Sequence, residues 1–184
     1  MAERTIESVA VFCGARDGED PRHLEAAASV GRTLAERGIT VVYGGGGTGL
    51  MGAVANGALG AGGTVVGVIP EALIGPELAH PDLAELHVVK TMAERKAMMA
   101  ELADVFLALP GGAGTLEEIV EQWSWAMLGY HSKPVGFLDV LGYWSPMREL
   151  VDHMRAEGFL SDRGAAMIRF ESTLPPLLTS LERA

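Results

Sequence analysis

The chain has 184 residues, enough to bury a continuous core, and its 48% hydrophobic content argues against disorder. Its net charge of −10 speaks against binding a nucleic-acid polymer, which needs a basic face, although a local cationic pair can still hold a small anion. The single cysteine, Cys13, excludes an intrachain disulfide and a paired-cysteine zinc site, and without a signal-like apolar start or a membrane-length apolar run we expect a cytoplasmic protein with no membrane partner.

Apolar runs and helical patterns alternate along the whole chain. In chain order they predict a strand at 8–13, a helix at 24–35, a strand at 40–43, a helix at 50–61, a strand at 64–69, an irregular connection at 71–84, a strand at 86–89, a helix at 92–102, a strand at 105–109, a helix at 116–127, a strand at 135–140, a helix at 146–156, a short apolar piece at 167–170 and a final helix. In the helix at 92–102 we expect Met92, Met99 and Leu102 to face inward. The pattern indicates an α/β fold, a Rossmann-like doubly wound parallel sheet with helices on both faces, in one domain over 1–184.

A first glycine-rich loop follows the predicted strand at 40–43, at the end of the sheet where such folds bind ligands. Residues 47–52 match G-x-G-x-x-G, and Glu71 stands roughly where an NAD site has its ribose-binding acid. The match lies in the second strand–helix unit rather than the first, so two interpretations compete with an NAD-dependent oxidoreductase. The glycines could serve only close packing of helix on strand, or Gly46, Gly47 and Thr48 could approach the ribose or phosphate of a mononucleotide.

The second glycine-rich loop, at 110–115, follows the predicted strand at 105–109. Its glycines let consecutive backbone N–H groups converge on an anion, and the dipole of the following helix adds to this. It is not a Walker A loop, because no Gly-Lys-Ser/Thr follows. A competing interpretation is a capping box with Thr115 as the N-cap and Glu118 at the third helical position; both roles can coexist.

Residues 110–118, PGGAGTLEE, fit the PGGxGTxxE signature of the LOG family of cytokinin-activating phosphoribohydrolases. The segments at 92–99 (MAERKAMM), 44–52, 125–129 and 133–136 extend the resemblance, which runs from about residue 9 to 160. It implies a Rossmann-like homodimer that hydrolyses the N-glycosidic bond of cytokinin riboside 5′-monophosphates, or of AMP, to the free base and ribose 5-phosphate. We expect no cofactor and no metal, since the five histidines show no ligand spacing.

The resemblance also implies roles for individual residues. Arg95 and Glu118 are its catalytic pair. The residues that it places around the nucleotide are Glu77, Lys96, Gly112, Ala113, Gly114, Thr115 and Ser124. Cleavage of a purine–ribose bond builds positive charge on the sugar, which a carboxylate can stabilise, and a guanidinium suits a forked grip on phosphate or a ribose hydroxyl.

The chain departs from the family pattern on the side that would hold the base. Residues 13–16, CGAR, stand where many members have a serine pair after the glycine, Ala113 replaces a common aromatic, and Met127 replaces a frequent glutamine. These positions leave open the preference between prenylated adenine and adenine. An alternative function is a nucleotide-like carrier without turnover, like the molybdenum cofactor carriers that resemble this family. A lysine decarboxylase is not indicated, because nothing marks Lys90, Lys96 or Lys133 as a Schiff-base lysine.

Overall fold

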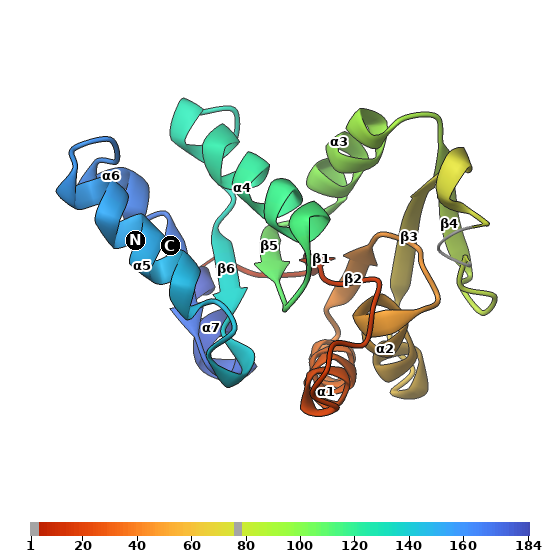
Figure 1. Cartoon of the computed structure of the whole chain (residues 1–184). Helices are drawn as coiled ribbons and strands as arrows, with labels where there is room; N and C mark the ends of the chain where they lie inside the picture. The colour runs from red at the N-terminus through yellow and green to blue at the C-terminus, as the bar shows by residue number, and fades with distance from the viewer. Residues whose placement is uncertain (1–3, 76–78) are drawn as a thin grey trace.

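The computed structural model describes residues 4–75 and 79–184, and one parallel sheet of seven strands organises them (Figure 1). Its order is β4-β3-β2-β1-β5-β6-β7, and every neighbouring pair is parallel. The strands are β1 (Ser8–Phe12), β2 (Thr40–Tyr43), β3 (Val65–Pro70), β4 (Glu85–Val89), β5 (Val105–Ala108), β6 (Val135–Leu138) and β7 (Ile168–Glu171). The central strands are short and apolar because both of their faces are covered.

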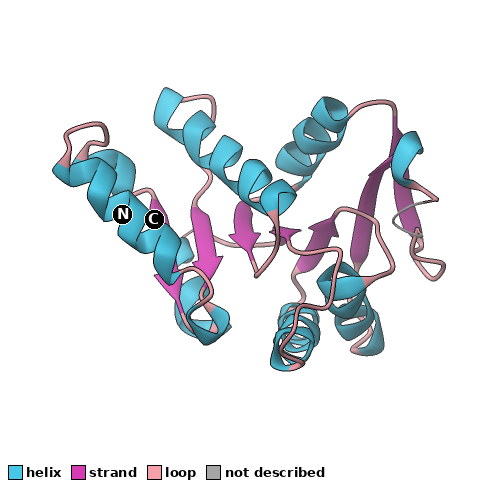
Figure 2. Cartoon of the chain, viewed as in Figure 1, coloured by secondary structure: helices cyan, strands magenta, loops and turns pink. Residues whose placement is uncertain are grey.

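Helices cover the two faces of the sheet, as Figure 2 shows. The helices are α1 (Arg22–Glu36), α2 (Gly49–Gly60), α3 (Met92–Leu102), α4 (Ala113–Leu128), α5 (Ser145–Ala156), α6 (Asp162–Ala165) and α7 (Leu174–Glu182), with 3-10 turns η1 (Glu71–Leu73) and η2 (Val140–Gly142). One core packs α1, α2 and α7 against the sheet, and the other packs α3, α4 and α5 against its opposite face. The doubly wound α/β fold predicted from the sequence is confirmed. None of the helices in these described residues is long and apolar enough to cross a bilayer.

One predicted detail is wrong, and the structure completes another. Met92 and Leu102, expected to face inward with Met99, are exposed, and only Met99 is buried. Met92 is the first residue of α3 and Leu102 is its last, so both lie at the ends of the helix. The apolar piece at 167–170 is the core of the edge strand β7, which pairs with β6 through contacts that a four-residue pattern does not reveal.

The strand order places a crevice between β1 and β5. After β1 the chain winds through β2 and β3 to β4 on one side, and after β4 it returns to β5 on the other side of β1. The loops that leave the carboxyl ends of β1 and β5 therefore diverge, and parallel α/β sheets bind ligands at such a switch point.

Candidate active site

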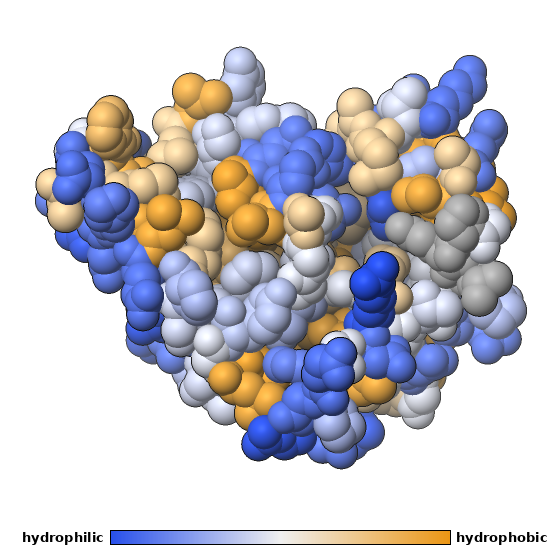
Figure 3. All heavy atoms as spheres, viewed as in Figure 1, coloured by the Kyte–Doolittle hydropathy of each residue, from blue (hydrophilic) through white to orange (hydrophobic). Residues whose placement is uncertain are grey.

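A cavity of about 710 Å³ opens at this carboxyl edge. It is lined by the end of β1 and the loop after it, by Gly44 after β2, by α3, by the loop after β5 with the first turns of α4, and by Tyr143 before α5. Figure 3 shows the molecule from the side that Figures 1 and 2 use, with apolar side chains in separate small patches. Both glycine-rich loops begin at this edge, as the sequence predicts.

Arg95 is the most deeply set charged group of the cavity, 4% exposed although it is an arginine. Its Nε donates to the carbonyl of Val68 at 3.0 Å, and its Nη2 donates to the carbonyl of Gly44 at 2.8 Å. These two carbonyls belong to neighbouring strands, β3 and the end of β2, so the sheet itself fixes the plane of the guanidinium. A methyl group on Gly44 would lie 1.8 Å from Nη2, which explains why that position has no side chain.

Glu118 faces Arg95 across the base of the cavity. It is 9% exposed, and its Oε1 lies 4.0 Å from Nη1 of Arg95. The two groups come from different helices, α4 and α3, which pack on the same face of the sheet. Cys13 lies beside them, and burial, followed by the charge of Glu118, raises the pKa of its thiol far above the ordinary value. The thiol is therefore neutral, and Arg95 and Glu118 are the charged groups at this end of the cavity.

The loop after β5 leads directly into α4, whose N-cap is Gly112. The first N–H groups of a helix, here those of Ala113, Gly114 and Thr115, have no acceptor within the helix, and they carry its positive dipole end. A methyl group would meet nothing within 4 Å at Gly112 or at Gly114, and both glycines line the cavity. This end of the cavity can therefore take an anion close to the backbone.

The capping-box interpretation of this loop is wrong. Thr115 is the third residue of α4 rather than its N-cap, and no side chain caps the helix. Thr115 is instead buried against Gly111, where a methyl group would lie 2.2 Å from its Oγ1. The helix begins three residues earlier than expected because Ala113, Gly114 and Thr115 belong to it, so Glu118 lies in its second turn and faces the cavity.

The structure brings together only part of the predicted site. Arg95, Glu118, Gly112, Gly114 and Thr115 line the cavity, whereas Lys96, Ala113 and Ser124 do not. Lys96 donates to Glu117 and, at 3.0 Å, to Oε1 of Glu121. Burial opposes the charge of Lys96, but its hydrogen bonds to these two carboxylates prevail and raise its pKa. Lys96 thus ties α3 to α4, and Glu77 lies outside the described residues.

Beyond Gly44, the glycines of the first loop allow close packing of the backbone. Gly46, Gly47 and Thr48 are not among the cavity-lining residues, although Gly44 is. Methyl groups on Gly49 and Gly52 would lie 2.3 Å from the backbone of Ala15 and from the carbonyl oxygen of Gly47, respectively. Of the three interpretations of the G-x-G-x-x-G match, close packing is the one that the geometry supports.

Sequence reasoning noted residues 13–16 only as departures from the family pattern on the base side, and it missed the rest of the loop after β1 and Tyr143. Residues 13–20, His23 and Tyr143 all line the cavity. The loop follows the first predicted strand, so its position at a carboxyl end was an available signal. The neighbour of β1 was not available, because the pairing of β1 with β5 is a long-range contact between residues about 96 positions apart.

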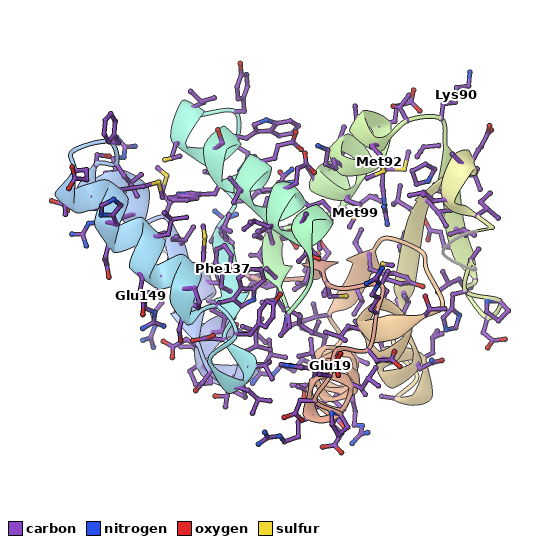
Figure 4. All side chains as sticks on the ribbon, in the orientation of Figure 1. Glu19, Lys90, Met92, Met99, Phe137 and Glu149 are labelled. Atoms are coloured by element: carbon purple, nitrogen blue, oxygen red, sulfur yellow. The ribbon has the colours of Figure 1, made fainter. Side chains whose placement is uncertain are left out.

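Neither a metal site nor a Schiff-base lysine is found in the described part of the chain. No group of three or more histidine, cysteine, aspartate or glutamate residues is placed to hold a metal ion there. Lys90 points away from the molecule in Figure 4, and Lys133 donates to the carbonyl of Ala100 at 2.6 Å, outside this cavity.

Comparison with known proteins places these features in a family. A family model described as possible lysine decarboxylase matches residues 51–181. The cytokinin riboside 5′-monophosphate phosphoribohydrolase of Rhodococcoides fascians is 49% identical over 162 residues, which cover 88% of this chain and 82% of that protein. The phosphoribohydrolase LOG of Oryza sativa subsp. japonica is 43% identical over 174 residues, covering 95% and 72%. The Moco carrier protein of Chlamydomonas reinhardtii shares the fold, with a TM-score of 0.71 over 97% of both chains at 21% identity.

Proposed function

This chain belongs to the LOG family of cytokinin riboside 5′-monophosphate phosphoribohydrolases, and we propose that it hydrolyses the N-glycosidic bond of cytokinin riboside 5′-monophosphates or AMP. The observation that carries the proposal is the buried pair of Arg95 and Glu118 beside the N-terminus of α4. A carboxylate, a guanidinium and an anion-binding helix end within one cavity match the three parts of such a substrate, which are the reacting sugar, its hydroxyls and the phosphate.

The chemistry follows from the charges. The bond between C1′ of the ribose and the purine nitrogen breaks as positive charge develops on the sugar. Glu118 stabilises that charge and orients the attacking water. The oxygen of this water bonds to C1′, and one of its protons ends on the nitrogen of the departing base. Arg95, held by the carbonyls of Val68 and Gly44, presents a fixed charge to the sugar or phosphate. The products are the free base and ribose 5-phosphate.

The proposal is tested by turnover of two substrates. We expect the purified protein to release adenine from AMP or isopentenyladenine from isopentenyl-AMP, with no added cofactor and in the presence of EDTA, because a carboxylate and a guanidinium supply the chemistry. Chromatography of the free base and of ribose 5-phosphate measures it. A loss of activity in EDTA that a divalent metal restores would contradict the cofactor-free mechanism.

The same experiment separates the competing functions. Tight binding of a nucleotide-like cofactor without base release would indicate a carrier, and hydride transfer to NAD would indicate an oxidoreductase. The carrier that shares this fold is only 21% identical to the chain, so the likeness concerns the fold alone.

We propose further that the protein is a homodimer. Met99 on α3 and Trp123 on α4 are buried within the chain, but Met127 and Leu128 at the end of α4 and Tyr130 just after it are exposed. Apolar side chains appear over the outer end of α4 in Figure 3. A second copy of the chain that covered these three side chains would remove their apolar surface from water. We expect a dimer mass by light scattering at micromolar concentration; a monomer mass would contradict the proposal.

A further inference from the structure

We propose that Tyr143 is a positioning residue for the phosphate end of the site. Its hydroxyl donates a hydrogen bond of 2.5 Å to the carbonyl oxygen of Gly111, in the loop that leads into α4. The inference rests on the proposed function, since it takes the N-terminus of α4 as the place where the substrate's phosphate binds. Tyr143 lies outside the PGGxGTxxE segment, on the turn between β6 and α5.

A strained turn aims Tyr143 at this loop. Leu141 has a φ of 56° and is the one non-glycine residue with positive φ in the described ranges, and Gly142 follows with a φ of 75°. A left-handed conformation is unfavourable for a leucine, and such strain persists only where the surroundings impose it. Here the Asp139 carboxylate accepts hydrogen bonds from the N–H of Trp144 at 2.5 Å and from Oγ of Ser145 at 3.3 Å. Hydrogen bonds within the turn itself therefore hold its strained conformation.

Packing of aromatic rings holds the tyrosine in place. The ring of Trp144 meets that of Phe137 edge-on at 5.2 Å between centroids, which anchors the turn in the core. The ring of Tyr143 makes similar edge contacts with Trp144 at 5.0 Å and with His23 at 6.0 Å. Tyr143 and His23 both line the cavity, so this contact joins the start of α1 to the turn before α5.

The hydrogen bond determines where one peptide group points. In a trans peptide the C=O and N–H groups point in opposite directions, so a bond that holds the Gly111 carbonyl also fixes the N–H of Gly112. On the other side of the loop, Thr115 packs against Gly111. The loop is thus clamped between Thr115 and Tyr143. Without the hydroxyl, two successive glycines would be freer to rotate, and phosphate binding would have to order them.

The test removes only the hydroxyl, with Tyr143→Phe, and compares it with Tyr130→Phe, a more exposed tyrosine outside the cavity. Loss of one such hydrogen bond predicts that the Kd for ribose 5-phosphate and for AMP, measured by calorimetry, rises roughly 2- to 10-fold. The KM for AMP should rise by the same factor with kcat within about twofold, and inhibition by adenosine, which has no phosphate, should not change. Tyr130→Phe should match the wild type in all of these.

Three results would overturn the inference: unchanged binding of ribose 5-phosphate, equal weakening of adenosine and ribose 5-phosphate, or a loss of kcat at constant KM. A wild-type protein that binds ribose 5-phosphate but releases no base would overturn the proposed function and leave the binding comparison for Tyr143 intact. A wild-type protein that does not bind ribose 5-phosphate would overturn both the phosphate assignment and the role of Tyr143.

Discussion

Glu118→Gln should lower kcat by roughly 10²- to 10⁴-fold with the fold intact. The substitution keeps the size of the side chain and its capacity for hydrogen bonds, and it removes the negative charge that would stabilise the sugar cation. Because α4 begins at Ala113 with Gly112 as its N-cap, no helix cap is lost with the carboxylate. Steady-state kinetics with AMP or isopentenyl-AMP, together with a melting curve, measure the effect.

Glu117→Gln is the matched control, one residue earlier on the same helix. Glu117 is exposed and turned about 100° around the helix from Glu118. It pairs with Lys96, but Glu121 also bonds to Lys96, so the control leaves one of the two ion pairs in place. The control should keep its turnover. Near-normal turnover of Glu118→Gln with a normal melting temperature would instead remove the catalytic assignment.

Gly44→Ala should lower kcat/KM by roughly 10²-fold, although position 44 has no side chain and takes no part in the chemistry. Its methyl group would lie 1.8 Å from Nη2 of Arg95, so the guanidinium must leave the Gly44 carbonyl and turn away from Glu118. The overpacking should also reduce the free energy of unfolding by about 1–3 kcal/mol. Kinetics and chemical denaturation measure the two effects.

Three further variants separate displacement of Arg95 from general damage to the fold. Arg95→Lys should lose a similar amount of activity, because one ammonium cannot reach two carbonyls on neighbouring strands as the planar fork does. Adding Gly44→Ala to Arg95→Lys should then cost little more, since both changes act on one contact. Gly60→Ala, at the end of α2 with nothing within 4 Å, should keep full activity. Additive losses in the double variant would show that Gly44 acts by another route.

The sequence by itself predicted most elements of the fold and, through the family resemblance, the residues that we propose for the site. Periodicity predicted alternating strands and helices, because both faces of a parallel sheet must be apolar and each helix needs one apolar side. The loop at 110–115 stood out because residue type and spacing are local properties of the chain, and the Arg95–Glu118 pair was implied by the resemblance of these segments to a known signature.

Tertiary structure decided everything that depends on which segments become neighbours. The pairing of β1 with β5 placed residues 13–20 in the cavity, and the pairing of β2 with β3 supplied the two carbonyls that fix Arg95. The tertiary structure also left Gly46 to Thr48 outside the cavity lining, and it placed Lys96 within hydrogen-bonding distance of Glu121 on α4. Strand order and side-chain direction arise from long-range packing, which a local pattern does not encode, and so the contact of Tyr143 with Gly111 became visible only in the folded chain.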